Sequence, residues 1–233
     1  MMITPFRDRV EAGQSLAEKL RGYANRTNVL VLGLPRGGVP VAAEVAVKLH
    51  APLDVFVVRK LGVPGQEELA MGAIATGGIR VLNAEVVAAL GIPDEVIAAV
   101  AADEMRELLR RERAYRADLP PPGVRGKTVI VVDDGIATGS TMLAAVAALR
   151  QLQAGRIVVA APTVAAASFS QIERAADEIV AVLVPESFRG VGQWYEDFRQ
   201  TTDEEVAALQ AKAKCSASQT TRYGMGRGRT SAE

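Results

Sequence analysis

The fold is decided by one stretch in the middle of the chain, Val129-Ile130-Val131-Val132-Asp133-Asp134-Gly135-Ile136-Ala137-Thr138-Gly139-Ser140-Thr141. Its four consecutive apolar residues predict a strand that is buried on both faces of a sheet. Two carboxylates end this strand, a loop of small residues follows, and residues 142–149 (MLAAVAAL) predict a helix. A strand, a loop and a helix in this order form the unit of a parallel α/β sheet.

The loop between this strand and this helix is suited to a phosphate group. It lies at a predicted helix N-terminus, where unpaired N–H groups and the helix dipole favour an anion. The hydroxyls of Thr138, Ser140 and Thr141 add donors beside those N–H groups. Asp133 and Asp134 would repel the same phosphate, so they suit sugar hydroxyls or a hydrated magnesium ion nearby. A ribose 5-phosphate combines these groups in one ligand.

Two better-known phosphate motifs do not fit this stretch. A Walker loop needs one more residue between its glycines than Gly135 and Gly139 have, and Ser140 stands where its lysine belongs. The dinucleotide fingerprint Gly-x-Gly-x-x-Gly after a first strand is absent from the sequence. A plain structural turn does not explain two carboxylates at the end of a buried strand.

Composition limits the class of protein further. The 233 residues carry 27 basic and 27 acidic side chains, so no overall charge draws the chain to nucleic acid or to a membrane surface. No segment approaches the span of about 20 uncharged residues that a membrane helix needs. The single cysteine, Cys215, cannot form an intramolecular disulfide, and residues 1–5 lack the apolar core of a signal peptide. We therefore expect a cytoplasmic protein that binds neither nucleic acid nor membrane.

The central stretch resembles the phosphoribosyl pyrophosphate (PRPP) motif of the type I phosphoribosyltransferases. The resemblance implies an α/β fold with a parallel β-sheet core flanked by helices, a small hood or lid region and an inserted long helix. It implies that Asp133 and Asp134 meet the ribose hydroxyls and hold Mg²⁺, through water. The 5-phosphate would lie in the loop formed by Ala137, Thr138, Gly139, Ser140 and Thr141.

A second strand, loop and helix precede this motif. Residues 28–32 predict a buried strand and residues 41–49 a helix, with the loop Gly33-Leu34-Pro35-Arg36-Gly37-Gly38-Val39-Pro40 between them. The backbone donors of this loop and the Arg36 guanidinium could bind a diphosphate. In the resembling family, the corresponding loop holds the pyrophosphate of PRPP, often with an unusual peptide conformation, and Arg36, Gly37 and Gly38 match that role.

Two adjacent cations follow the strand predicted at residues 53–58. Arg59 and Lys60 stand at its end, where the resemblance implies contact with the pyrophosphate. Residues 69–82 predict a hairpin around the turn Thr76-Gly77-Gly78. The family places a mobile lid here, and a lid would exclude water from a cationic transition state.

The remaining segments complete the predicted domain, which we place at residues 1–214. Residues 93–117 form an insertion with one long helix, whose arginine cluster is either a solvated face or a nucleic-acid patch. Strands are predicted at 156–161 and 178–183, with a helix at 163–176 between them, so the sheet is parallel. A short acidic helix should end near residue 214, and the tail 215–233 has the composition of a disordered segment.

The hood is predicted at about residues 185–200, where the aromatic residues of the chain gather. Trp194 and Tyr195 lie in this segment together with two phenylalanines. The resemblance implies that an aromatic side chain here contacts the acceptor. The alternative is a hydrophobic anchor that seals the open edge of the sheet.

The activity that the resemblance implies is a pentosyl transfer of the glycosyltransferase type. A nitrogenous acceptor would displace pyrophosphate from PRPP, as in nucleotide metabolism and salvage, with Asp133, Asp134, Arg36 and Lys60 as the catalytic residues. The alternative is a regulator that binds PRPP or a nucleotide without turnover. A sugar-phosphate hydrolase or kinase would need motifs that the sequence lacks. The acceptor and the choice between monomer and homodimer stay open.

Overall fold

The computed structural model describes residues 4–117 and 119–224 of the chain, and its core is a five-stranded parallel sheet. The strand order is β2-β1-β6-β7-β8, and every neighbouring pair is parallel. The bounds are β1 Val29–Gly33, β2 Leu53–Val55, β6 Thr128–Val132, β7 Arg156–Thr163 and β8 Glu178–Leu183. This arrangement confirms the predicted α/β fold with a parallel core flanked by helices.

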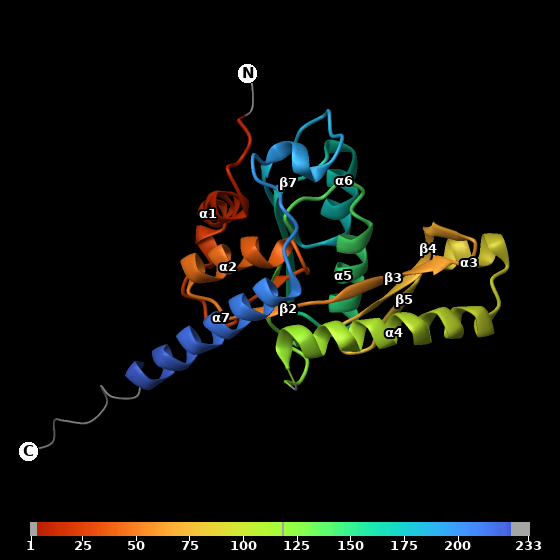
Figure 1. Ribbon diagram of the computed structural model, residues 1–233, viewed down its shortest axis with the longest axis horizontal. Helices are drawn as coiled ribbons and strands as arrows, with labels where there is room; N and C mark the ends of the chain where they lie inside the picture. The colour runs from red at the N-terminus through yellow and green to blue at the C-terminus, as the bar shows by residue number, and fades with distance from the viewer. Residues whose placement is uncertain (1–3, 118, 225–233) are drawn as a thin grey trace, which may run out of the picture.

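Strand β6 is buried on both faces, as its four apolar residues predict. Val129 and Val131 pack in the cluster that contains helices α5 and α6, whereas Ile130 and Val132 pack in the cluster that contains α1 and α2. Figure 1 shows these two helix layers on either side of the sheet. Their bounds are α1 Arg9–Lys19, α2 Gly38–Leu49, α5 Ser140–Gln151 and α6 Ala166–Ala175, and the short 3₁₀ helix η1 at Arg21–Tyr23 follows α1.

A second, antiparallel sheet projects from this core. It has the order β3-β4-β5, with bounds Val58–Val63, Gln66–Ala75 and Ile79–Leu82. Helix α3 at Ala84–Leu90 and the long helix α4 at Asp94–Arg116 follow, and α4 lies along the projecting sheet (Figure 1). Leu61 and Met71 of the sheet share a buried cluster with Ile97 and Leu108 of α4. The helix that we predicted as an insertion therefore covers the predicted hairpin.

The strand predicted at residues 53–58 is wrong in its extent. The structure ends β2 at Val55, and the chain then enters β3 of the second sheet, so Arg59 and Lys60 lie inside β3 and not at the end of a core strand. The physical reason is that the apolar run continues from one sheet to the other: Phe56 is buried in the core cluster that contains α5, and Val57 in the cluster that contains α4. Helix α3, which the sequence reading missed, is capped by the Asn83 side chain.

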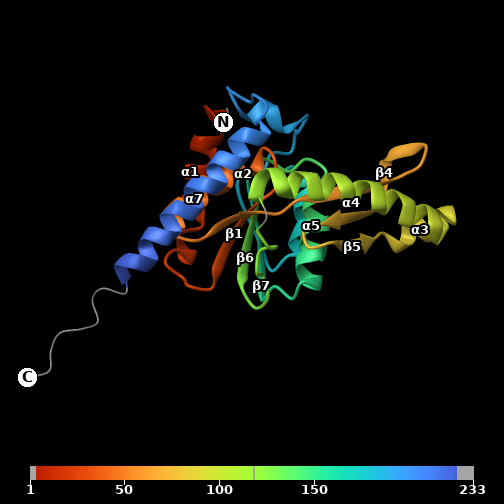
Figure 2. The ribbon, with the colours of Figure 1, turned by 60° about the horizontal axis from the view of Figure 1, so that its bottom comes forward.

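The C-terminal segment after β8 packs against the edge of the core at α2 and β2. A 3₁₀ helix, η2, spans Val191–Trp194 in the predicted hood, and α7 spans Asp203–Gly224. Figure 2 shows α7 running past α2, and it also packs against α4 and β2. We predicted that this helix ends near residue 214, but it continues to Gly224, so the predicted tail, 215–233, begins inside α7. The rest of that tail, residues 225–233, lies outside the described residues. Within the described part of the chain, no helix is long and apolar enough to span a membrane.

Candidate functional site

The acidic pair and the glycine-rich loop meet at the carboxyl ends of β6 and β1, which are neighbours in the sheet. A Cβ atom placed on Gly37 would lie 1.9 Å from Oδ2 of Asp134. A Cβ atom placed on Gly38 would lie 2.6 Å from the Val132 carbonyl oxygen and 2.8 Å from Cα of Asp133. The loop therefore rests directly on the acidic pair, at a distance that only glycine allows. The Pro35–Arg36 peptide bond in this loop is cis, an unusual conformation of the kind that the resemblance implies.

The predicted 5-phosphate loop leads into α5 with its hydroxyls accessible. Gly139 has a φ of 75°, a conformation that favours glycine, and α5 begins at the next residue. The Thr138 and Ser140 hydroxyl oxygens lie 3.2 Å apart, and both residues are exposed. The Ser168 hydroxyl donates a hydrogen bond of 2.5 Å to the Ala137 carbonyl, which ties the loop to α6. The first N–H groups of α5 have no partner within their own helix and suit an anion.

Asp134 forms a buried ion pair that the sequence did not predict. Its Oδ2 atom accepts a hydrogen bond of 2.9 Å from Nε of Arg9 in α1 and forms an ion pair with Nη2 of the same side chain at 2.7 Å. The side chains are only 11% (Arg9) and 13% (Asp134) exposed. The Arg9 guanidinium also donates to the Arg199 carbonyl (2.7 Å) and lies 4.2 Å from the centre of the Phe198 ring. Arg9 thus holds the Oδ2 atom of Asp134 in place from α1.

Asp133 forms no such ion pair with any of the described residues, although the charge of Arg9 acts on it electrostatically. Its Oδ1 atom accepts a hydrogen bond of 2.9 Å from the Asp134 N–H group. Burial, with the Asp134 carboxylate beside it, raises the pKa of Asp133 well above its ordinary value. Donors or a cation supplied by a ligand would favour its charged form. Among the described residues there is no group of three or more His, Cys, Asp or Glu side chains that could hold a metal ion.

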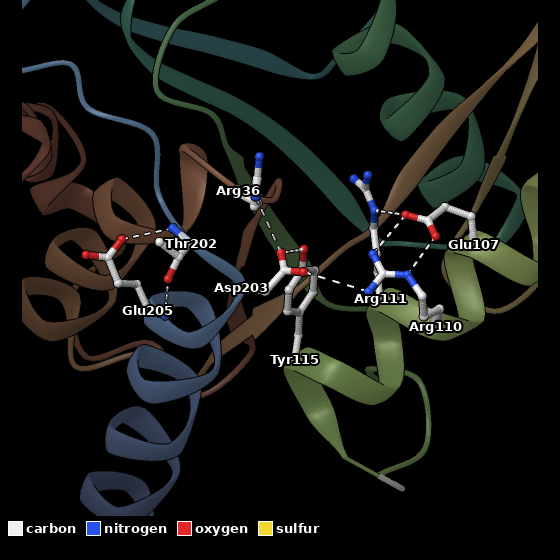
Figure 3. Close-up of polar contacts among 8 residues, drawn as sticks. All are labelled: Arg36, Glu107, Arg110, Arg111, Tyr115, Thr202, Asp203 and Glu205. Carbon is white, nitrogen blue, oxygen red and sulfur yellow. Dashed lines mark hydrogen bonds and ion pairs between the residues drawn. The ribbon is translucent and has the colours of Figure 1, made fainter.

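Arg36 extends from the glycine-rich loop toward α7 and α4, as Figure 3 shows. Its Nη1 atom lies 3.8 Å from Oδ1 of Asp203, the first residue of α7. The same oxygen accepts a hydrogen bond of 2.7 Å from the Tyr115 hydroxyl of α4. The Arg36 side chain is 34% exposed, so part of its guanidinium can still meet a ligand.

Arg59 and Lys60, the other predicted pyrophosphate residues, line a hollow between the β3–β4 turn and α4. The Arg59 guanidinium donates to Glu104 of α4 at 2.6 Å. This pairing holds Arg59 on the projecting sheet. The structure therefore brings together Arg36, Gly37, Gly38 and the acidic pair, whereas a role for Arg59 and Lys60 on pyrophosphate stays a prediction.

The two aromatic residues of the hood differ in their surroundings. Tyr195 is buried between the Phe6 and Phe198 rings, and its hydroxyl donates to the Asp134 carbonyl at 2.6 Å. This packing fits the alternative of an anchor. The Trp194 ring lies 6.1 Å from that of Phe188, and its Nε1 atom is buried without a hydrogen-bond partner among the described residues. Only Trp194 therefore offers an unused donor.

Sequence reasoning missed three residues of this site: Arg9, Tyr115 and Asp203. Each lies in a helix far from the two loops in sequence: Arg9 in α1, Tyr115 in α4 and Asp203 in α7. The one available signal was a Thr-x-x-Glu capping box, Thr202 to Glu205, which fixes where α7 begins. No local sequence pattern indicates that Arg9 pairs with Asp134, that Asp203 pairs with Arg36, or that Tyr115 binds Asp203.

Comparison with known proteins agrees with this geometry. The profile of the phosphoribosyl transferase domain matches residues 2–183. A Mycobacterium tuberculosis (strain H37Rv) protein with the provisional name phosphoribosyl transferase Rv0571c is 45% identical over 208 residues, which are 89% of this chain and 47% of the relative. The chain thus spans about half the length of the curated relatives it matches. The crystal structure of TT1426 from Thermus thermophilus superposes with a TM-score of 0.80 at 40% identity and covers 90% of this chain and 99% of that one.

The strand, loop and helix units around the acidic pair therefore define a phosphoribosyl transferase domain. The chain belongs to the phosphoribosyl transferase domain family.

Proposed function

We propose that this chain transfers the 5-phosphoribosyl group of PRPP to a nitrogenous acceptor and releases pyrophosphate. The single observation that carries the proposal is the glycine-rich loop lying directly on Asp133 and Asp134, at the edge of the sheet where α5 also begins. PRPP is a ligand that uses all three features together: the loop for its diphosphate, the two carboxylates for its ribose hydroxyls and the helix N-terminus for its 5-phosphate. The family membership supports the same class of reaction.

The reaction needs no nucleophilic side chain. The bond between C1 of the ribose and the pyrophosphate oxygen breaks, and its electron pair leaves with pyrophosphate. The acceptor nitrogen forms a bond to C1 and loses its proton. The sugar ring carries positive charge in the transition state, so Asp133 and Asp134 stabilise it while they hold the hydroxyls.

Arg36 stabilises the charge that develops on the leaving pyrophosphate, together with the N–H groups of Gly37 and Gly38. A charge-assisted hydrogen bond of this kind contributes about 1.5–3 kcal/mol. Positioning of the two reactants in one site could contribute about 7–11 kcal/mol. Mg²⁺, held through water by Asp133 and Asp134, would neutralise pyrophosphate oxygens when it is bound.

The acceptor is placed beside Trp194 in this proposal. A Cβ atom on Gly135 would lie 2.4 Å from Cγ1 of Val191, so the hood rests on the motif itself. The buried, unpaired Nε1 of Trp194 would donate to a carbonyl or a ring nitrogen of the acceptor. This chemistry fits a purine, a pyrimidine or another nitrogen heterocycle.

The test is pyrophosphate release from PRPP and Mg²⁺ with a panel of purine and pyrimidine bases. Asp133→Asn is the informative variant, because Asp134 has the additional pairing with Arg9. Loss of one charge-assisted contact should lower kcat/KM about 10- to 150-fold. The exposed Asp103→Asn, on α4, is the control and should leave the rate unchanged.

Two results would contradict the proposal. A rate for Asp133→Asn equal to that of the wild type would remove the acidic pair from the chemistry. Measurable PRPP binding by calorimetry without release of pyrophosphate with any base would favour the alternative, a regulatory protein that binds PRPP without turnover.

A further inference from the structure

Asp203, at the start of α7, connects the predicted pyrophosphate loop to two helices that are remote from it in sequence. One carboxylate oxygen lies 3.8 Å from Nη1 of Arg36, and the other lies 3.8 Å from Nη1 of Arg110 on α4. Figure 3 shows the carboxylate between these side chains, with Tyr115 beside it. The family profile ends at residue 183, so Asp203 belongs to a part of the chain outside the matched domain.

The Asp203 carboxylate is itself held in place. The Tyr115 hydroxyl donates to its Oδ1 atom at 2.7 Å. Burial and this hydrogen bond raise the pKa of Tyr115 to about 12, so the hydroxyl keeps its proton near neutral pH. The orientation of Asp203 is therefore set from α4.

The backbone that carries Asp203 is fixed as well. The Thr202 N–H group donates to the Glu205 carboxylate at 2.9 Å, and the Glu205 N–H group donates to the Thr202 hydroxyl at 3.2 Å. This reciprocal pair is a capping box, which holds the first turn of a helix in one geometry (Figure 3). Val206 is fully buried in the cluster between α4, α7 and the second sheet. The start of α7 is therefore a rigid support.

We propose that Asp203 is the positioning residue of Arg36, and that it holds the guanidinium ready for the diphosphate of PRPP. The inference rests on the proposed function, because it assigns Arg36 to the pyrophosphate. A free arginine side chain loses rotamer freedom when a ligand orders it, which lowers affinity by a factor of about 2 to 12. Asp203 contacts Nη1 and would leave the other N–H groups of Arg36 for phosphate oxygens.

The opposite role for Asp203 predicts the opposite sign. A carboxylate that competed with the diphosphate for Arg36 would weaken PRPP binding, and its removal would tighten it. A purely structural ion pair would affect every ligand equally. Comparing PRPP with ribose 5-phosphate separates these roles, because ribose 5-phosphate lacks the diphosphate but uses the same acidic pair and phosphate loop.

The experiment is titration calorimetry of the full chain with PRPP and with ribose 5-phosphate, in the presence of Mg²⁺. Asp203→Asn should weaken PRPP binding about 2- to 12-fold and change ribose 5-phosphate binding by less than about twofold. Tyr115→Phe, which keeps the Asp203 charge and removes its anchor, should shift PRPP in the same direction by a smaller factor.

Glu107→Gln is the matched control on the same polar cluster. Glu107 accepts hydrogen bonds from Arg110 and Arg111, which lower its pKa to about 2, and it lies on α4 with Tyr115. This variant should leave both affinities within about twofold of the wild type. Thermal unfolding of all three variants would show that each is folded.

Three outcomes would overturn the inference. PRPP binding by Asp203→Asn that is unchanged or tighter excludes a positioning role. Equal weakening of PRPP and ribose 5-phosphate makes the contact structural. A wild-type chain that binds neither ligand refutes the proposed function and this inference with it, whereas a wild type that binds both, with an unaffected Asp203→Asn, refutes only the inference.

Discussion

Replacement of Arg9 by methionine should destabilise the protein by about 3–5 kcal/mol near neutral pH. The change keeps the apolar length of the side chain and removes the cation that holds Asp134. Both side chains are nearly buried, at 11% and 13% exposure, and the guanidinium makes its two contacts with Asp134 at 2.9 and 2.7 Å. A buried carboxylate without its partner is the reason for this magnitude. Typical domains unfold at about 5–15 kcal/mol, so the loss is a large fraction of the total.

The pH dependence of this loss has a definite sign. Burial raises the pKa of Asp134, and Arg9 opposes that effect. Without Arg9 the native-state pKa of Asp134 should rise further, and a protonated Asp134 leaves no unpaired charge. The difference in unfolding free energy between wild type and Arg9→Met should therefore be largest above the raised pKa of Asp134 and shrink as the pH falls through it.

The assay is urea unfolding followed by circular dichroism, on Arg9→Met, Asp134→Asn and the double variant. Arg9→Met leaves the buried Asp134 carboxylate without its cation, and Asp134→Asn removes the charge that Arg9 faces, so both should be destabilised, and the double variant should recover part of the loss. A loss below about 1 kcal/mol for Arg9→Met would show that Asp134 does not depend on the Arg9 cation. So would a double variant whose loss equals the sum of the two single losses.

Three further predictions concern single side chains. Gly37→Ala places a Cβ atom 1.9 Å from a carboxylate oxygen of the acidic pair, so the loop must shift, which should cost about 1–3 kcal/mol of stability. The affinity for PRPP, measured by calorimetry, should fall. Gly22→Ala is the control, because a Cβ atom there meets nothing within 4 Å, and it should be neutral. The hydrogen bond from Arg150 lowers the pKa of Asp177 below its ordinary 3.8. The stabilising contribution of Asp177 is therefore complete above pH 3.8 and is lost as the pH falls through the lowered pKa. Asp177→Asn should make the free energy of unfolding depend less on pH in this acidic range. Trp194→Ala should raise the KM of the acceptor more than that of PRPP in steady-state kinetics, and the reverse pattern would move Trp194 out of the acceptor site.

The core of the fold could be predicted because its signals are local. Four apolar residues in β6 face two helix layers alternately, and a strand buried in this way needs no other information to be recognised. The strand predicted at 178–183 has the same bounds in the structure. The two ligand loops follow their strands directly, and neighbouring parallel strands bring their carboxyl ends together. Contiguous sequence therefore placed Arg36 and Asp133 in one site.

The antiparallel sheet was harder to predict, because an apolar run does not show where a chain leaves one sheet for another. Residues 53–58 have the alternation and composition of a single strand, yet the turn between β2 and β3 falls within them. Phe56 and Val57 are fully buried in both interpretations, so burial could not distinguish them. The consequence for function is that Arg59 and Lys60 were assigned to the wrong sheet.

The charges around the site were not predictable, because each belongs to an ion pair that only the folded chain brings together. Arg9 reaches Asp134 from the first helix, and Asp203 reaches Arg36 from the last one, across the whole length of the sequence. In each pair a side chain of the proposed site, Asp134 or Arg36, lies beside a partner of opposite charge from a terminal helix. Such pairing limits the entropy lost when the ligand binds, since the functional side chain is already ordered. The first and last helices therefore order charged side chains of the central loops, although those loops carry the residues that the sequence predicts to be functional.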